Sequence, residues 1–180
     1  LDFVYPRACR GCGDVEPGAS MHLCWDCLAR VPTITMPFCS RCGDPAEGQI
    51  EHAYVCALCR RFEPRFDLAR SAVRYRGTMR DVLQGFKYSA DVSVADDLVG
   101  MLEACTRAHY SHIRFDALAG VPLHVRRERE RTYNQSRLLA SGLARRLRVP
   151  LATKRCVTRK RETASQTGLN ADRRRENVRG

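Results

Sequence analysis

Eight of the ten cysteines in this sequence lie in four CxxC pairs within its first third. Successive pairs are separated by 11, 11 and 13 residues. Each CxxC turn presents two thiolates to one side of a metal ion and a second turn closes a tetrahedron, so this spacing is typical of structural zinc sites. We therefore predict two zinc sites whose ligands are Cys9, Cys12, Cys24, Cys27, Cys39, Cys42, Cys56 and Cys59.

Two ways of combining the four pairs are compared. Sequential pairing is favoured because each half is then a complete local unit, whereas a cross-braced arrangement would join alternate pairs. Disulfides are the rival chemistry, but they require an oxidising compartment, and residues 1–10 contain no long apolar stretch of the export-signal type. Four thiolates leave no open coordination position, so the predicted metals are structural.

Residues 1–62 contain few large apolar side chains, so we expect this segment to depend on bound metal for folding. The two remaining cysteines, Cys105 and Cys156, lie in apolar settings away from the pairs. We expect both to be ordinary buried cysteines.

The positive charge is concentrated in the last third of the chain. The net charge is +11, and it divides into −1 over residues 1–62, 0 over residues 63–125 and +12 over residues 126–180. This asymmetry favours a polyanionic partner or a phosphate-bearing ligand. A solvated basic face without a specific ligand is the alternative.

Residues 63–180 show alternating helix and strand patterns after a linker at 60–70. Apolar side chains recur at helical spacing over 77–89, 91–108 and 132–150, and Gly142 is expected to allow close helix packing. Strands are predicted at 68–76, 115–124 (buried) and 152–160. The sequence therefore predicts an α/β fold with a parallel sheet, in two domains at 1–62 and 63–180.

The segment 121–135, VPLHVRRERERTYNQ, lies between a predicted strand and a predicted helix. Ligands of open α/β sheets bind at this end of the strands, where a helix N-terminus can hold an anion. Its four arginines, Arg126, Arg127, Arg129 and Arg131, could pair with phosphate oxygens. A solvated loop is the equally simple reading.

Four stretches together closely resemble the ComF family. They are the tandem CxxC pairs, FKYSADVSVADDL (86–98), VPLHVRRERERTYNQSRLLASGLAR (121–145) and RKRETASQTGLNADRRRENVRG (159–180). Members of this family are competence-associated proteins similar to type I phosphoribosyltransferases, with an N-terminal double zinc ribbon. The resemblance covers nearly the whole chain and implies this two-part architecture.

The resemblance also implies residue roles. A pyrophosphate-binding loop would contain Pro122, Leu123, Arg126, Arg127, Arg131, Asn134 and Gln135. A mobile hood over the sugar phosphate would span Arg159 to Asn170 and include Thr163 and Gln166, and Lys87 would face the site. Two structural Zn²⁺ ions are implied, together with Mg²⁺ in the full-length enzyme.

Members of the family continue with an apolar strand, two acidic residues and a Thr/Gly-rich turn that cradles the 5′-phosphate. No such segment occurs in residues 1–180, where the one Asp pair, Asp96-Asp97, lies in a helical pattern. We therefore expect the chain to be C-terminally truncated and, by itself, inactive in phosphoribosyl transfer. No catalytic residue can be assigned from the sequence.

Three functions remain open at this stage. The first is a phosphoribosyltransferase-like protein, of the glycosyltransferase class, that binds phosphoribosyl pyrophosphate or a related phosphosugar. The second is a nucleic-acid-binding protein for DNA uptake, with single-stranded DNA as a partner. The third is a module that docks proteins of the uptake machinery. A cytoplasmic location is expected, and no apolar run is long enough for membrane insertion.

Overall fold

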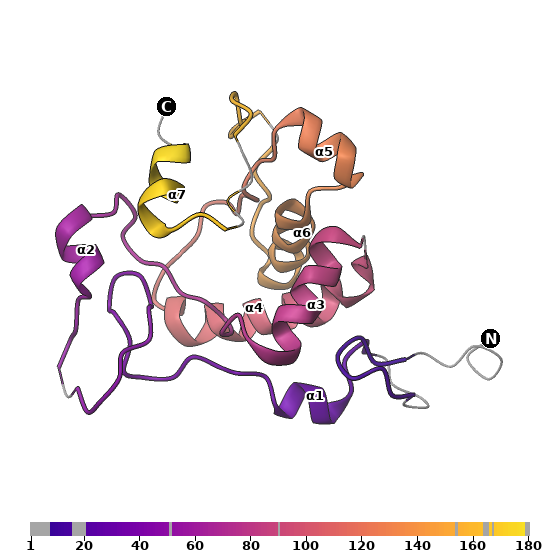
Figure 1. Ribbon diagram of the computed structural model, residues 1–180, viewed down its shortest axis with the longest axis horizontal. Helices are drawn as coiled ribbons and strands as arrows, with labels where there is room; N and C mark the ends of the chain where they lie inside the picture. The colour runs from indigo at the N-terminus through magenta and orange to yellow at the C-terminus, as the bar shows by residue number, and fades with distance from the viewer. Residues whose placement is uncertain are drawn as a thin grey trace.

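The computed structural model describes residues 8–15, 21–50, 52–89, 91–153, 155–163, 166 and 168–178. Their regular elements are helical (Figure 1). In chain order they are α1 (Trp25–Ala29), α2 (Ala57–Phe62), α3 (Gly77–Tyr88), the 3₁₀ turn η1 (Val92–Val94), α4 (Ala95–Tyr110), α5 (Val125–Arg131), α6 (Gln135–Leu147) and α7 (Ala171–Val178).

The predicted helices are confirmed, and their apolar periodicity explains their packing. Met79, Val82 and Phe86 form the buried stripe of α3. Helix α4 packs along α6, where a Cβ atom on Gly142 would lie 2.6 Å from Cγ2 of Val99. Gly142 therefore permits the close approach that its sequence position predicted.

The predicted strands do not form in the described residues, so a parallel sheet is not shown. Two isolated bridges lie at or beside the predicted strands: Val73 pairs with Thr33 in the antiparallel sense, and Leu118 pairs with Leu151 in the parallel sense. The segment 115–124 was expected to be buried, but its residues are half-buried or exposed, with Val121 at 68%. In the described residues this segment pairs with a neighbour only at Leu118, so no further strands flank it and its side chains stay partly exposed.

The first ribbon shares a hydrophobic core with the helices. Cys9, Leu23 and Cys27 lie in one buried cluster with side chains of α3, η1 and α4, including Met79 and Leu98. The second ribbon has its own small cluster of Cys39, Cys56 and Cys59. The proposed division at residue 62 stays a prediction, and the larger core crosses it.

The second ribbon contacts the rest of the molecule through hydrogen bonds to residues 64–70 and through aromatic rings. The Phe38 ring lies edge-on to His109 of α4, with centroids 5.5 Å apart, and the guanidinium of Arg70 lies over the same ring. At the other end of the chain, the Arg175 guanidinium lies 3.6 Å from the centroid of Phe62, which places α7 beside α2 (Figure 1).

Some cysteine and surface features differ from expectation. Cys156 is exposed because the segment around it does not form the predicted strand, and Cys105 is half-buried, so neither is fully buried.

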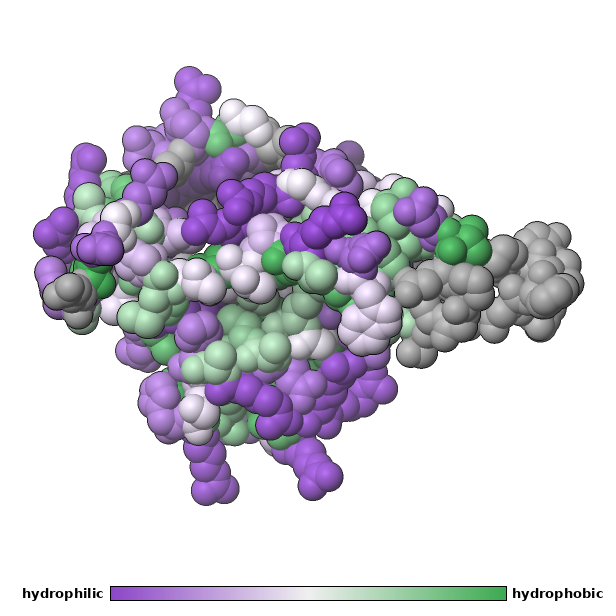
Figure 2. All heavy atoms as spheres, turned by 90° about the horizontal axis from the view of Figure 1, so that it is seen from below, coloured by the Kyte–Doolittle hydropathy of each residue, from purple (hydrophilic) through white to green (hydrophobic). Residues whose placement is uncertain are grey.

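Hydrophobic side chains also reach the surface between hydrophilic ones on the face seen in Figure 2. Within the described residues, no helix is both long and apolar enough to span a membrane.

Candidate metal centres and anion-binding loop

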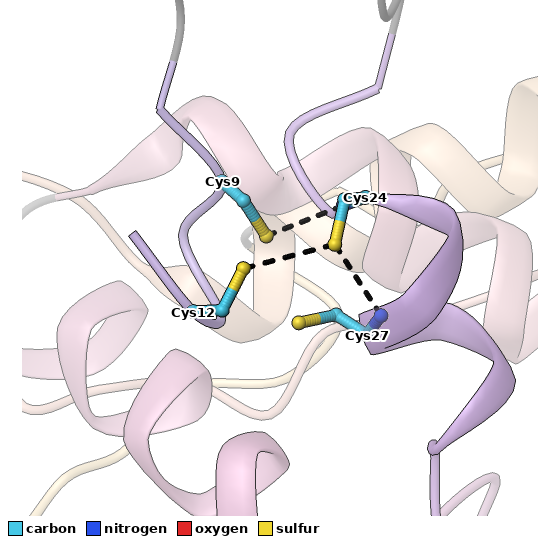
Figure 3. Close-up of side chains that lie close together, drawn as sticks. All are labelled: Cys9, Cys12, Cys24 and Cys27. Carbon is cyan, nitrogen blue, oxygen red and sulfur yellow. Dashed lines mark hydrogen bonds between the residues drawn. The ribbon is translucent and has the colours of Figure 1, made fainter. Parts of the chain in front are cut away.

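The eight paired cysteines form two separate clusters. One contains Cys9, Cys12, Cys24 and Cys27 and the other contains the four later cysteines, and in each the sulfur atoms lie within 4.8 Å of one another. The four side chains of the first cluster point toward a common centre (Figure 3). This arrangement confirms sequential pairing.

The sulfur spacing fits tetrahedral zinc. The Sγ atoms of Cys12 and Cys24 are 3.8 Å apart, and those of Cys42 and Cys56 are 3.7 Å apart. Zinc–thiolate bonds of about 2.3 Å predict an edge of roughly 3.8 Å for a regular tetrahedron. The cysteine positions therefore suit a structural Zn²⁺ ion in each cluster.

The same local fold builds both sites from the repeated motif CxxCGD, which begins at Cys9 and again at Cys39. In each copy the glycine N–H donates to the carbonyl of the first cysteine at 2.8 Å. Both glycines, Gly13 and Gly43, have positive φ, at 84° and 71°. This left-handed conformation favours glycine and turns the chain back behind the sulfur atoms.

The third cysteine of each site begins a helix. Cys24 is the N-cap of α1 and accepts a hydrogen bond at Sγ from the N–H of Cys27, at 3.4 Å. Cys56 is the N-cap of α2 and accepts in the same way from Cys59. The helix start therefore fixes the spacing of the last two sulfur atoms in each site.

The first cysteine of each site has a lowered pKa. Burial raises the pKa of Cys9, but N–H donors of Cys24, Cys12 and Gly11 outweigh this effect and lower it to about 6. The same balance lowers the pKa of Cys39 to about 6. Backbone donors aimed at sulfur stabilise the thiolate form that a metal requires.

A small cavity lies beyond the carboxyl side of the Leu118–Leu151 bridge. Its volume is about 180 Å³. Of the residues predicted to form the pyrophosphate loop and the hood, it brings together Pro122, Leu123, Asn134 and Arg159. Arg137 of α6, which the sequence did not single out, also lines it.

The loop is fixed to the start of α6 by three hydrogen bonds. Asn134 caps α6 by accepting from the N–H of Arg137 at 3.1 Å, and its amide nitrogen donates to the carbonyl of Val121 at 3.1 Å. The N–H of Val121 donates to Oγ of Ser136 at 2.8 Å. These contacts hold the loop against a helix N-terminus, where backbone N–H groups can bind an anion.

Gly120 makes this close approach possible. A Cβ atom there would lie 2.6 Å from Cα and 2.7 Å from the backbone nitrogen of Arg137. Any side chain would push the loop away from α6. Gly120, Ser136 and Arg137 were missed by sequence reasoning, and the glycine directly before VPLH was the available signal.

The loop arginines are paired with acids rather than gathered at the cavity. Arg126 contacts Glu130 at 3.3 Å and Glu162 at 3.5 Å, and Arg127 contacts Glu130 at 3.6 Å. Arg126, Arg127 and Glu130 belong to α5, which sequence reasoning treated as a loop because it has no apolar face, whereas Glu162 lies in the predicted hood. The alternating charges instead support the helix through pairs three and four residues apart.

Two further predicted cations, Lys87 of α3 and Arg131 of α5, lie together at the last residue of α3. The Lys87 ammonium and the Arg131 guanidinium lie over the ring of Tyr88, at 5.7 and 5.0 Å from its centroid. Gln135 is the first residue of α6, and its side-chain oxygen is buried without a hydrogen-bond partner. None of these three residues lines the small cavity.

The described part of the predicted hood runs beside α5. Arg159 donates a hydrogen bond to the Thr163 hydroxyl, and Glu162 makes the contact with Arg126 given above. Gln166 is exposed. Residues 164, 165 and 167 of this segment lie outside the described residues.

A wider cavity of about 700 Å³ lies at the opposite end of the Leu118–Leu151 pair, between the C-terminal ends of α4 and α6. Tyr110, Phe115, Arg114 and Arg148 contribute to its lining. It faces the amino side of the extended segments and contains none of the residues predicted for the pyrophosphate loop or the hood. The smaller cavity is therefore the better candidate for an anion.

Comparisons with known proteins agree with the cysteine geometry. Residues 1–61 match the protein-family model described as a double zinc ribbon domain. The chain is 29% identical to Competence protein F of Haemophilus influenzae, over 89% of this chain and 69% of that protein. It is 30% identical to Competence protein ComFC of Bacillus subtilis, over 72% of this chain and 54% of that protein.

A further relative is named for DNA utilisation. The chain is 27% identical to the DNA utilization protein YhgH of Escherichia coli K12, over 87% of this chain and 74% of that protein. No solved structure matches the chain.

Proposed function

We propose that this chain, which is similar to competence and DNA utilisation proteins over most of its length, is a member of the ComF family and serves DNA uptake or utilisation through a site that binds phosphoribosyl pyrophosphate or a related phosphosugar. The proposed fold of residues 63–180 is the phosphoribosyltransferase type, in which Leu118 and Leu151 mark neighbouring parallel strands. The proposed location is the cytoplasm.

The observation that carries this proposal is the small cavity at the start of α6. It combines a capped helix N-terminus, the close approach at Gly120, and the guanidinium-bearing residues Arg137 and Arg159. A phosphate group at this place would meet N–H dipoles and two cations together.

The ion pairs of α5 offer a way for the site to respond to its ligand. The Arg126 guanidinium forms ion pairs with both Glu130 and Glu162, and its side chain is 68% exposed. Exposed ion pairs contribute little free energy, so pyrophosphate oxygens can replace these carboxylates. Such an exchange would break the Arg126–Glu162 contact and let the hood change its position relative to α5 when the ligand binds.

Phosphoribosyl transfer would additionally need Mg²⁺, which binds mainly through substrate phosphates and a few carboxylates. Glu128 is the carboxylate residue among the described lining of the cavity, so the chain's own contribution to a magnesium site would be small. Bound Mg²⁺ would neutralise charge on the leaving pyrophosphate, while Arg137 and Arg159 would orient it.

Calorimetric titration of the full-length protein with phosphoribosyl pyrophosphate and Mg²⁺ tests this function. We expect saturable binding that Arg137→Gln weakens about tenfold, as for loss of a charge-assisted hydrogen bond. Arg145→Gln is the matched control because Arg145 is exposed on the same helix and does not line the cavity. Absence of binding by the wild-type protein would overturn the proposal.

Binding of single-stranded DNA is a second candidate function, favoured by the exposed basic residues of the C-terminal third. They include Arg129, Arg145, Arg148, Arg155, Arg173 and Arg174. Binding through phosphate contacts should weaken steeply with salt. Titration of a labelled single-stranded oligonucleotide at two salt concentrations tests it, and salt-insensitive or absent binding would exclude this surface. Docking of uptake proteins by the ribbon remains the third hypothesis.

A further inference from the structure

We infer that the first zinc site, and not the second, holds the loop 121–135 in its binding geometry, with Asp97 and Tyr133 as positioning residues. This inference rests on the proposed phosphosugar site for its functional meaning. Its structural basis is a continuous set of contacts from the first cysteine cluster, through α4 and α3, to the start of α6.

The first contact joins the ribbon to α4. Asp97 is 5% exposed and lies in the first turn of α4. Its Oδ2 accepts hydrogen bonds from the N–H groups of His22 at 2.9 Å and Leu23 at 3.0 Å, directly before the ligand Cys24. A buried carboxylate with two donors holds that backbone in one position, because losing either donor would leave a buried charge less well satisfied.

The second contact joins the cysteines to α3. Cys9 and Cys27 are buried in the cluster that contains Met79, Val82 and Phe86. A Cβ atom on Gly11 would lie 2.7 Å from Sγ of Cys27 and 2.8 Å from Cγ2 of Thr78, so the metal-binding turn presses directly on α3. Movement of the ligand sulfur atoms would therefore disturb α3.

The third contact joins α3 to the loop. The Tyr133 hydroxyl donates a hydrogen bond to the carbonyl of Phe86, and the two rings lie edge to face with centroids 5.9 Å apart. Tyr133 packs against the same core cluster as Cys9 and Cys27. It directly precedes Asn134, the residue that caps α6 and holds Val121.

Among the described residues, no equivalent series of contacts joins the second zinc site to the loop. Its buried cysteines, Cys39, Cys56 and Cys59, pack with Cys42, Tyr54 and Val55, all within the ribbon. Its ribbon reaches α4 through Phe38, whose ring meets His109 at the far end of that helix from Asp97. It is also tied to the segment before α3, where the N–H of Ala69 donates to the carbonyl of Arg41 at 2.8 Å and Arg70 donates to the carbonyl of Ser40 at 2.9 Å, and none of these contacts involves residues 121–135. Loss of this metal should leave the loop in place.

Hydrogen–deuterium exchange of the zinc-loaded, full-length protein tests the inference. Cys12→Ser and Cys42→Ser alter equivalent ligands of the two sites, and Cys12 is exposed, so its replacement opens no core cavity. Each variant should hold one zinc fewer. We expect exchange of residues 121–135 to become about tenfold faster in Cys12→Ser, and to keep the wild-type rate in Cys42→Ser.

Equal exchange of the loop in both variants would overturn the inference. If Cys12→Ser unfolds the whole chain, Tyr133→Phe decides the matter, because it keeps the ring and the zinc and removes one hydrogen bond. That variant should speed exchange of 121–135 about fivefold and leave α4 unchanged. An unchanged loop in Tyr133→Phe would exclude it as a positioning residue.

The exchange measurement needs no ligand, so it separates this inference from the proposed function. Titration with phosphoribosyl pyrophosphate and Mg²⁺ is the second measurement. If the wild-type protein does not bind, the phosphosugar function fails while the exchange result still decides the coupling. If it binds, Tyr133→Phe should weaken binding without changing the zinc content.

Discussion

The Asp97 carboxylate accepts a hydrogen bond of 3.0 Å from the backbone N–H of Leu23, which lies 74 residues earlier in the chain. Both residues are buried, at 5% and 2% exposure. The contact ties the first turn of α4 to the first zinc ribbon, and it makes the stability of one depend on the other.

Asp97→Ala should therefore lower the free energy of unfolding by about 2–3 kcal/mol, because the N–H groups of His22 and Leu23 lose their acceptor. Urea denaturation measures this loss. Asp96→Ala is the matched control, since Asp96 is exposed and its pair with Arg146 lies on the surface; it should cost less than about 1 kcal/mol. Equal losses for the two variants would contradict the prediction.

Substitution of two helical glycines should have opposite effects. In Gly142→Ala the new methyl group meets Val99 at 2.6 Å, so the variant should be destabilised by about 1–3 kcal/mol. Val99→Ala in the same chain should recover part of that loss. Gly85→Ala meets open space on α3 and should stabilise by about 0.5–1 kcal/mol. Thermal unfolding of the three variants is the measurement, and a neutral Gly142→Ala would show that the helices can separate.

Glu103 should contribute to the acid stability of the α4–α6 pair. Hydrogen bonds from Arg107 and Arg146 lower the pKa of Glu103 against the opposing effect of burial. Because the folded-state pKa is depressed, the contribution is complete above the ordinary glutamate pKa of about 4.3, and it is lost as the pH falls through the lower folded value.

Glu103→Gln should accordingly show a smaller loss of stability than the wild type as the pH is lowered through this window. Unfolding free energies at a series of pH values give the comparison. The same slope in both proteins would mean that Glu103 does not gain its ion pairs on folding.

Glu130→Gln should raise the affinity for phosphoribosyl pyrophosphate if the proposed site is correct. Glu130 contacts both Arg126 and Arg127, and its neutralisation releases two guanidinium groups toward the ligand. Exposed ion pairs contribute roughly 0.2–1 kcal/mol, so a gain of about two- to fivefold is expected by calorimetry. A decrease in affinity would show that Glu130 orients the arginines for binding.

The sequence was sufficient for features with strong local patterns. Four CxxC pairs predicted both metal sites, and regular apolar spacing predicted α3, α4 and α6. Helix α5 has no apolar face and is supported by ion pairs along its surface. In the sequence, such a run of charged residues cannot be distinguished from a solvated loop. The Asp97–Leu23 contact could not be predicted, because nothing local to either residue indicates a partner 74 positions away.

The expected strands show the opposite error. Apolar residues near 115–124 suggested burial, but burial of a strand depends on neighbours that the local pattern does not reveal. The same holds for Cys156, whose exposure follows from its surroundings rather than from its residue type.

The core shared by the first ribbon and the helices has a consequence for how the protein assembles. A cut after residue 62 would separate Leu23 from Met79 and Leu98 and leave an apolar face of α3 and α4 in water. The helical body thus completes its interior only after the N-terminal cysteines have acquired their metal. Zinc supply during synthesis would then limit the yield of the entire folded protein, and not of the ribbon alone.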